Sequence, residues 1–156
     1  MCILRGFRLP DGIVPIYPVF TMNLKQFMPS MLMMVDDEII SPGFTSFCSA
    51  CIIRKGGDPA LNPILSPLNA PDFLLRLLPQ TQILVCEIDG LRDQGYSMAL
   101  RMQKLGVKVH IHHLSDFVHG FCNMDTNGIG INEFRRATNT IISIFREMLQ
   151  LPLPKQ

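Results

Sequence analysis

The stretch from Val85 to Phe121 constrains the fold of this chain more than any other part of it. A short apolar run at Val85–Ile88 predicts a strand, and helical periodicity from about Arg92 to Leu105 predicts a helix. Alternation of apolar and polar residues over 107–111 predicts a second strand. Because a tight hairpin cannot join parallel strands, a strand, a helix and a strand of these lengths predict a parallel βαβ unit.

Two polar side chains follow the two predicted strands. Asp89 lies just past the end of the first strand, and His119 lies a few residues past the end of the second. Parallel strands end at the same edge of a sheet, which is where open α/β sheets bind their ligands. We therefore expect the carboxylate and the imidazole to meet there. Gly120 allows either a close backbone approach or an unusual backbone dihedral angle beside the imidazole.

The rest of the chain adds one more strand and several helices. A turn at residues 10–12 precedes a predicted strand at about Gly12–Tyr17, and a long crossover from about residue 20 to residue 81 returns the chain to the sheet. The crossover holds a Met-rich segment at 28–34, which either fills the core or forms an adaptable surface. It also holds a predicted helix at 44–53, and a last amphipathic helix is predicted at about 132–149.

Length and composition set limits on the kind of protein. The chain has 156 residues, of which 47% are hydrophobic, and a net charge of +1. These values predict about one domain, which we place at residues 1–150 with a short tail at 151–156, and they give no reason to propose binding to nucleic acid. No apolar run is long enough for a membrane span, and the N-terminus does not resemble a signal peptide, so a cytoplasmic location is expected.

The cysteines do not form a disulfide framework. There are five, an odd number without framework spacing, which favours free thiols in a reducing compartment. Cys48 and Cys51 form a C-x-x-C pair, which leaves zinc or redox chemistry as the alternative. Zinc would need two more ligands at matching spacing, and a redox pair normally follows a strand.

The histidines and one acidic loop were the other candidate metal ligands. On a strand, His110 and His112 share one face and His113 lies on the other, so edge-strand histidines are the favoured interpretation. A calcium loop beginning at Asp125 would place Arg136 where a bidentate Glu is required. We therefore predict no metal and no cofactor.

Four blocks of the sequence resemble the hormone-sensitive-lipase type of esterase, in the order that this family has. The blocks are Pro10-Asp11-Gly12 with Tyr17-Pro18, residues 62–79, Asp89-Gly90-Leu91-Arg92-Asp93, and His119-Gly120-Phe121. The resemblance implies an α/β fold that is the C-terminal portion of an α/β-hydrolase, with about three parallel strands and flanking helices. It also implies that Asp89 is the acid and His119 the base of a catalytic triad, 30 residues apart. Asp93 is expected to cap the following helix.

The chain departs from this family in one respect. It contains neither a G-x-S-x-G nucleophile elbow nor an H-G-G-G-type oxyanion loop. We expect it to be a C-terminal fragment of a serine hydrolase for acylglycerols or steryl esters, inactive by itself, with contact to a lipid droplet or membrane surface. Two other hypotheses stay open. One is a catalytically dead remnant, or pseudoenzyme, that acts as an interaction or structural module. The other is a small α/β binding domain whose Asp–His pair is incidental.

Overall fold

The computed structural model describes residues 2–23, 25–37, 39–53, 55–124 and 132–151. They fall into two units, Met1–His119 and Gly120–Gln156, and each is described here by itself. Most of the loop that was tested as a calcium site and residues 152–156 of the expected tail lie outside the described residues.

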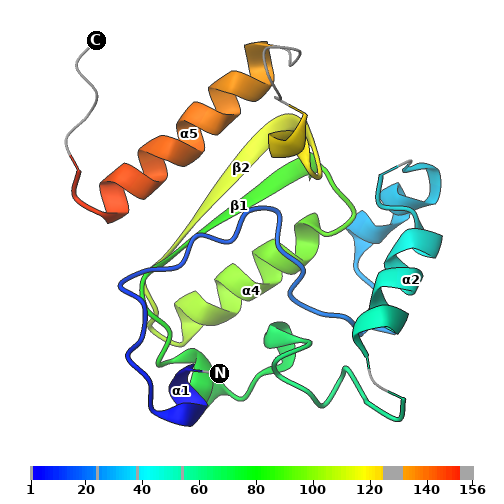
Figure 1. The fold of residues 1–156 in the computed structure, drawn as a ribbon, viewed down its shortest axis with the longest axis horizontal. Helices are drawn as coiled ribbons and strands as arrows, with labels where there is room; N and C mark the ends of the chain where they lie inside the picture. The colour runs from blue at the N-terminus through cyan, green and yellow to red at the C-terminus, as the bar shows by residue number, and fades with distance from the viewer. Residues whose placement is uncertain (1, 24, 38, 54, 125–131, 152–156) are drawn as a thin grey trace. The chain divides into compact units, whose positions relative to one another are not determined.

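The first unit is built on the predicted βαβ motif (Figure 1). Strand β1 (Thr81–Ile88) and strand β2 (Val109–Val118) pair in parallel, and helix α4 (Arg92–Lys104) connects them. Strand β2 runs well past the predicted end at residue 111. Helix α4 covers one face of β1, and its approach is close because Gly95 has no side chain: a Cβ there would lie 2.3 Å from Cγ1 of Val85.

The predicted first strand is an extended segment rather than a regular strand. Residues 12–17 run alongside β1 on the side away from β2 (Figure 1). Two isolated parallel bridges join the segment to β1, Ile13 with Thr81 and Ile16 with Leu84. Pro15 accepts a hydrogen bond from Leu84 through its carbonyl oxygen but has no N–H to donate, so the ladder is interrupted. The sheet of the described residues therefore has two strands, with this segment in place of the third.

The long crossover between residues 20 and 80 consists of short helices. In chain order they are the 3₁₀ helix η1 (Pro29–Asp36), helix α2 (Pro42–Ile52), the 3₁₀ helix η2 (Pro67–Asn69) and helix α3 (Asp72–Leu75). Helix α1 (Cys2–Arg5) precedes the extended segment. Met28 and Met34 of the Met-rich segment are buried, which confirms core filling for these two side chains.

The second unit contains the 3₁₀ helix η3 (Phe121–Asn123) and helix α5 (Asn132–Met148), which confirms the predicted last helix. The buried residues of α5 are Ala137, Ile141 and Ile144, which recur at helical spacing. Among the described residues, no helix is both long and apolar enough to cross a membrane.

Candidate active site

The structure brings the two predicted site residues into direct contact. Oδ2 of Asp89 lies 3.0 Å from Nδ1 of His119. The Asp89 side chain is 1% exposed, whereas that of His119 is 20% exposed. An ionised carboxylate can only accept a hydrogen bond, so the proton of a neutral imidazole lies on Nδ1 and Nε2 keeps its lone pair. This arrangement gives the pair one buried end and one accessible end.

An irregularity in β2 determines where the imidazole lies. The two strands pair with an offset of 28 residues as far as Cys86 and Leu114, but Ile88 pairs with Val118, an offset of 30. Two additional residues of β2 are therefore absorbed in a bulge just before the strand ends. Since Val118 lies beside Ile88, the next residue of β2, His119, lies beside the residue that follows β1.

One side chain of β1 holds the bulge. Asp116 adopts a positive φ of 64°, and its backbone N–H donates to Oε2 of Glu87 at 2.9 Å. The carbonyl oxygen of Glu87 in turn accepts from Nη1 of Arg92 at 3.1 Å. Sequence reasoning gave Glu87 no role, because the pairing that brings these residues together depends on the bulge.

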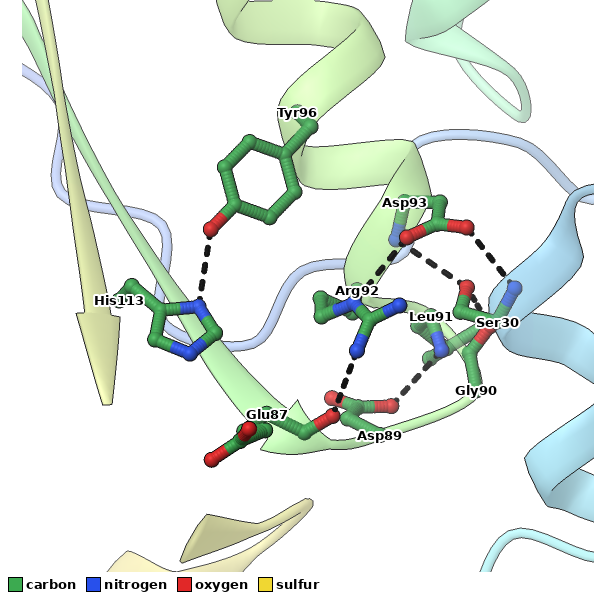
Figure 2. A network of polar contacts seen from close by, with 9 residues as sticks. All are labelled: Ser30, Glu87, Asp89, Gly90, Leu91, Arg92, Asp93, Tyr96 and His113. Atoms are coloured by element: carbon green, nitrogen blue, oxygen red, sulfur yellow. Dashed lines mark hydrogen bonds and ion pairs between the residues drawn. The ribbon is translucent and has the colours of Figure 1, made fainter. Parts of the chain in front are cut away.

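A backbone group in the turn after β1 also contacts the Asp89 carboxylate. The backbone N–H of Leu91 donates to Oδ1 of Asp89 at 2.8 Å (Figure 2). Since Oδ2 contacts His119, each carboxylate oxygen has a hydrogen-bond partner. The turn leads directly into α4, whose positive N-terminal end favours a negative charge nearby. The turn thus fixes the position of the carboxylate independently of the imidazole.

The acidic residue in the first turn of α4 has a different role from the predicted one. Asp93 was expected to cap the helix, but the N-cap residue is Leu91 and the helix has no side-chain cap. Instead, Oδ2 of Asp93 accepts from the backbone N–H of Ser30, and Oδ1 accepts from Nε of Arg92. The prediction was wrong because the partner of Asp93 lies 63 positions earlier in the chain.

An aromatic ring packs against the imidazole. The ring centroids of Tyr17 and His119 are 4.6 Å apart, with an interplanar angle of 54°. Tyr17 has a φ of 36°, which is rare for a residue with a side chain, and strained residues of this kind cluster at functional sites. Sequence reasoning placed Tyr17 at the end of a strand without a role. Its signal was its place before Pro18, in one of the blocks that carry the family resemblance.

A largely apolar cavity of about 130 Å³ opens beside the imidazole. Its walls come from η1, α2, the segment after Pro18 and the start of α4. Its lining residues include Thr21, Met31, Met34, Leu91, Gln94 and His119. A cavity with mostly apolar walls and one basic nitrogen suits an uncharged ligand with a hydrocarbon portion.

The other candidate ligands contact protein groups. Nε2 of His112 lies 2.7 Å from Oε1 of Gln82, and the hydroxyl of Tyr96 lies 2.8 Å from Nδ1 of His113. Within the described part of the chain, no three His, Cys, Asp or Glu side chains form a group that could bind a metal ion. The two cysteines of the C-x-x-C pair are free thiols on α2.

Comparison with known proteins places the chain in the α/β-hydrolase fold family. The family described as alpha/beta hydrolase fold matches residues 2–123. Hormone-sensitive lipase of Bos taurus is 34% identical over 93 residues, which are 60% of this chain and 12% of that protein. Neutral cholesterol ester hydrolase 1 of Rattus norvegicus is 43% identical over 75 residues, 46% of this chain and 18% of that protein.

Among solved structures, carboxyl esterase 2 from the fungus Tuber melanosporum is similar, with a TM-score of 0.78 and 26% identity. The match covers 94% of this chain and 47% of the fungal esterase. The chain therefore spans less than half of that enzyme and about an eighth of the lipase. These findings confirm the predicted α/β fold class and the resemblance to esterases of the hormone-sensitive-lipase type.

Proposed function

We propose that this chain, which belongs to the α/β-hydrolase fold family, supplies the acid and the base of a serine carboxylic-ester hydrolase. Asp89 is the acid and His119 is the base, and the nucleophilic serine comes from outside these 156 residues. The observation that carries the proposal is the 3.0 Å contact between a buried carboxylate and a partly exposed imidazole beside an apolar cavity. No metal and no cofactor takes part in this chemistry.

The reaction begins with a proton transfer to the imidazole. A serine hydroxyl is a weak nucleophile, so Nε2 of His119 takes its proton as the oxygen attacks the ester carbonyl. The imidazolium that forms is stabilised by the Asp89 carboxylate on Nδ1. His119 then returns the proton to the departing alcohol, and a water molecule releases the acyl group by the same steps.

We propose lipid esters, either acylglycerols or steryl esters, as the substrate class. The apolar walls of the cavity suit a hydrocarbon chain, and the names of two relatives, hormone-sensitive lipase and neutral cholesterol ester hydrolase 1, agree with this class. The proposal includes a cytoplasmic protein whose residues 1–150 form one partial hydrolase domain, with contact to a lipid droplet or membrane surface.

Substitution of the acid tests the proposal. The coding sequence upstream of this chain is determined from the transcript. A longer protein that joins an in-frame G-x-S-x-G segment to this chain is then assayed with chromogenic esters of increasing acyl length. Asp89→Asn is expected to lower kcat by about 10⁴, because the wrong imidazole tautomer is then held. A loss below tenfold would remove Asp89 from the triad.

The 156-residue chain serves as the matched control. It is expected neither to hydrolyse a short-chain ester nor to react with a fluorophosphonate probe, since it has no elbow serine. If this chain hydrolyses an ester and His119→Ala abolishes that activity, the proposal that the nucleophile comes from outside the chain is wrong.

A second candidate function is that of a non-catalytic interaction or structural module. It is favoured by one observation, the absence of a G-x-S-x-G sequence from the chain. Mapping the 5′ end of the transcript separates the two candidates. A transcript that starts at Met1 supports the module, and an upstream in-frame elbow supports the enzyme.

A further inference from the structure

The 3₁₀ helix η1 is hydrogen-bonded to the turn that carries the acid. Ser30 is 2% exposed, and its backbone N–H donates to Oδ2 of Asp93 at 2.8 Å. The hydroxyl of Ser30 donates to the carbonyl oxygen of Gly90 at 2.9 Å and accepts from the backbone N–H of Asp93 at 3.2 Å. Figure 2 shows these three contacts around Gly90, the residue next to Asp89. One serine thus binds both Gly90 of the turn and Asp93 at the start of α4.

A second residue of η1 packs against the same turn. A Cβ on Gly90 would lie 2.0 Å from Cγ of Met34 and 2.7 Å from its Sδ, so the Met34 side chain occupies the space that Gly90 leaves. Met34 is 3% exposed and packs with Ile40 and Leu91 in a small apolar cluster. Leu91 is the residue whose N–H binds Asp89. Hydrogen bonds and packing from η1 therefore act on residues 89–93, which are the turn and the start of α4.

The same helix forms part of the cavity wall. Met31 and Met34 both line the cavity beside His119, whereas the side chain of Ser30 contacts Gly90 and Asp93. A group that enters the cavity contacts Met34, and Met34 contacts the turn. Because protein interiors are close-packed, a displacement of one side chain is passed to its neighbours.

We propose that Ser30 and Met34 are positioning residues for the acid, and that they connect occupation of the cavity to the placement of the Asp89 carboxylate. This inference rests on the proposed function, in which the cavity receives the hydrocarbon portion of an ester. The ligand that fills the cavity presses Met34 against Gly90, and Ser30 keeps the turn from moving away. The acid is then held at hydrogen-bond distance from His119 when substrate is bound, which a triad requires.

Removal of the Ser30 hydroxyl tests the first half of the proposal. In the enzyme that includes its serine segment, Ser30→Ala is expected to lower kcat about tenfold and to change KM less than twofold, since one hydrogen-bonded group is lost outside the cavity. Hydrogen exchange of residues 88–94 should rise about tenfold in the same variant. Ser41→Ala is the matched control, because that hydroxyl accepts from a backbone N–H at the start of α2, at Phe44. It should leave exchange in 88–94 unchanged.

A rescue experiment tests the packing contact and does not depend on Ser30. Gly90→Ala places a methyl group against Met34 and is expected to lower kcat at least tenfold. In the double variant Gly90→Ala/Met34→Ala only Cβ of residue 34 remains, at an ordinary contact distance of 3.4 Å. The double variant should regain most of the kcat lost and the exchange protection of 88–94. A double variant no better than Gly90→Ala alone would refute the coupling.

The exchange measurement separates this inference from the proposed function. If no variant and no wild-type protein hydrolyses esters, but exchange in 88–94 rises in Ser30→Ala and is restored in the double variant, the positioning holds and the enzyme proposal fails. If the wild type is active while Ser30→Ala alters neither exchange nor kcat, the positioning is wrong. Should Ser30→Ala fail to fold, the comparison of Gly90→Ala with the double variant decides.

Discussion

Gln94 offers the clearest measurement of how the site is held together. Its side chain is 3% exposed, and Oε1 accepts from the backbone N–H groups of Phe20 and Thr21 at 2.9 and 3.0 Å. Both donors belong to buried residues, so Gln94→Met, which keeps the length of the side chain, removes the acceptor of two buried N–H groups. Each unsatisfied group costs about 1–3 kcal/mol. We expect the variant to lose about 2–6 kcal/mol of unfolding free energy.

Denaturant titration measures this loss, and the same substitution elsewhere on α4 provides the control. The amide of Gln103 is exposed and only 3.4 Å from the carbonyl oxygen of Val109, so Gln103→Met should change the unfolding free energy by less than about 0.5 kcal/mol. The midpoint of Gln94→Met should fall while the slope stays the same. A loss below about 1 kcal/mol for Gln94→Met would refute the assignment of two dependent N–H groups.

Two further substitutions test how the strands and α4 are fixed. Gly95→Ala brings a Cβ to 2.3 Å from the stiff Val85 side chain, and overpacking of this kind costs about 1–3 kcal/mol of stability. In the control Gly43→Ala the Cβ meets no atom nearer than 3.9 Å, so this variant should be about 0.5 kcal/mol more stable. Thermal unfolding measures both. An equal gain in both variants would contradict the close contact. Glu87→Ala removes the acceptor of the Asp116 N–H and should lower the unfolding free energy by about 1 kcal/mol. Glu87→Gln keeps an acceptor oxygen and should therefore lose much less. Equal losses in the two Glu87 variants would show that this hydrogen bond does not hold the bulge.

The sequence was sufficient to predict the βαβ unit and the meeting of Asp89 with His119. Apolar periodicity is a local property and predicts each strand separately. Because parallel strands end at the same edge of a sheet, Asp89 and His119, which each follow a predicted strand, are then expected to lie close together. Gly120 behaves as expected as well, with a φ of 77°. The regular strand predicted at 12–17 is interrupted because Pro15 cannot donate to the ladder, which the sequence already indicated.

The supporting contacts could not be predicted in the same way. The bulge before His119 changes the pairing offset from 28 to 30, and although Ser115 and Asp116 are residues that favour turns, they do not indicate how many residues the bulge absorbs. Ser30 and Asp93 are 63 positions apart and are joined only when the crossover folds back on α4. A serine in a Pro-Ser-Met sequence and an aspartate in the first turn of a helix both have ordinary local explanations. The long-range partner replaced the local one, and one sequence alone does not indicate which of the two prevails.

The cost of the buried acid bears on the choice between an enzyme and a module. A carboxylate that is 1% exposed is unfavourable unless hydrogen bonds compensate its lost hydration. Asp89 receives this compensation from Leu91 and His119, and its turn is tied by Ser30 to a helix that lines a cavity. A structural module would be served as well by an apolar residue, since such replacements of buried charges are often neutral or stabilising. A pair whose buried end is fixed and whose other end opens on an apolar cavity suits proton transfer, which supports the proposed enzyme over the module.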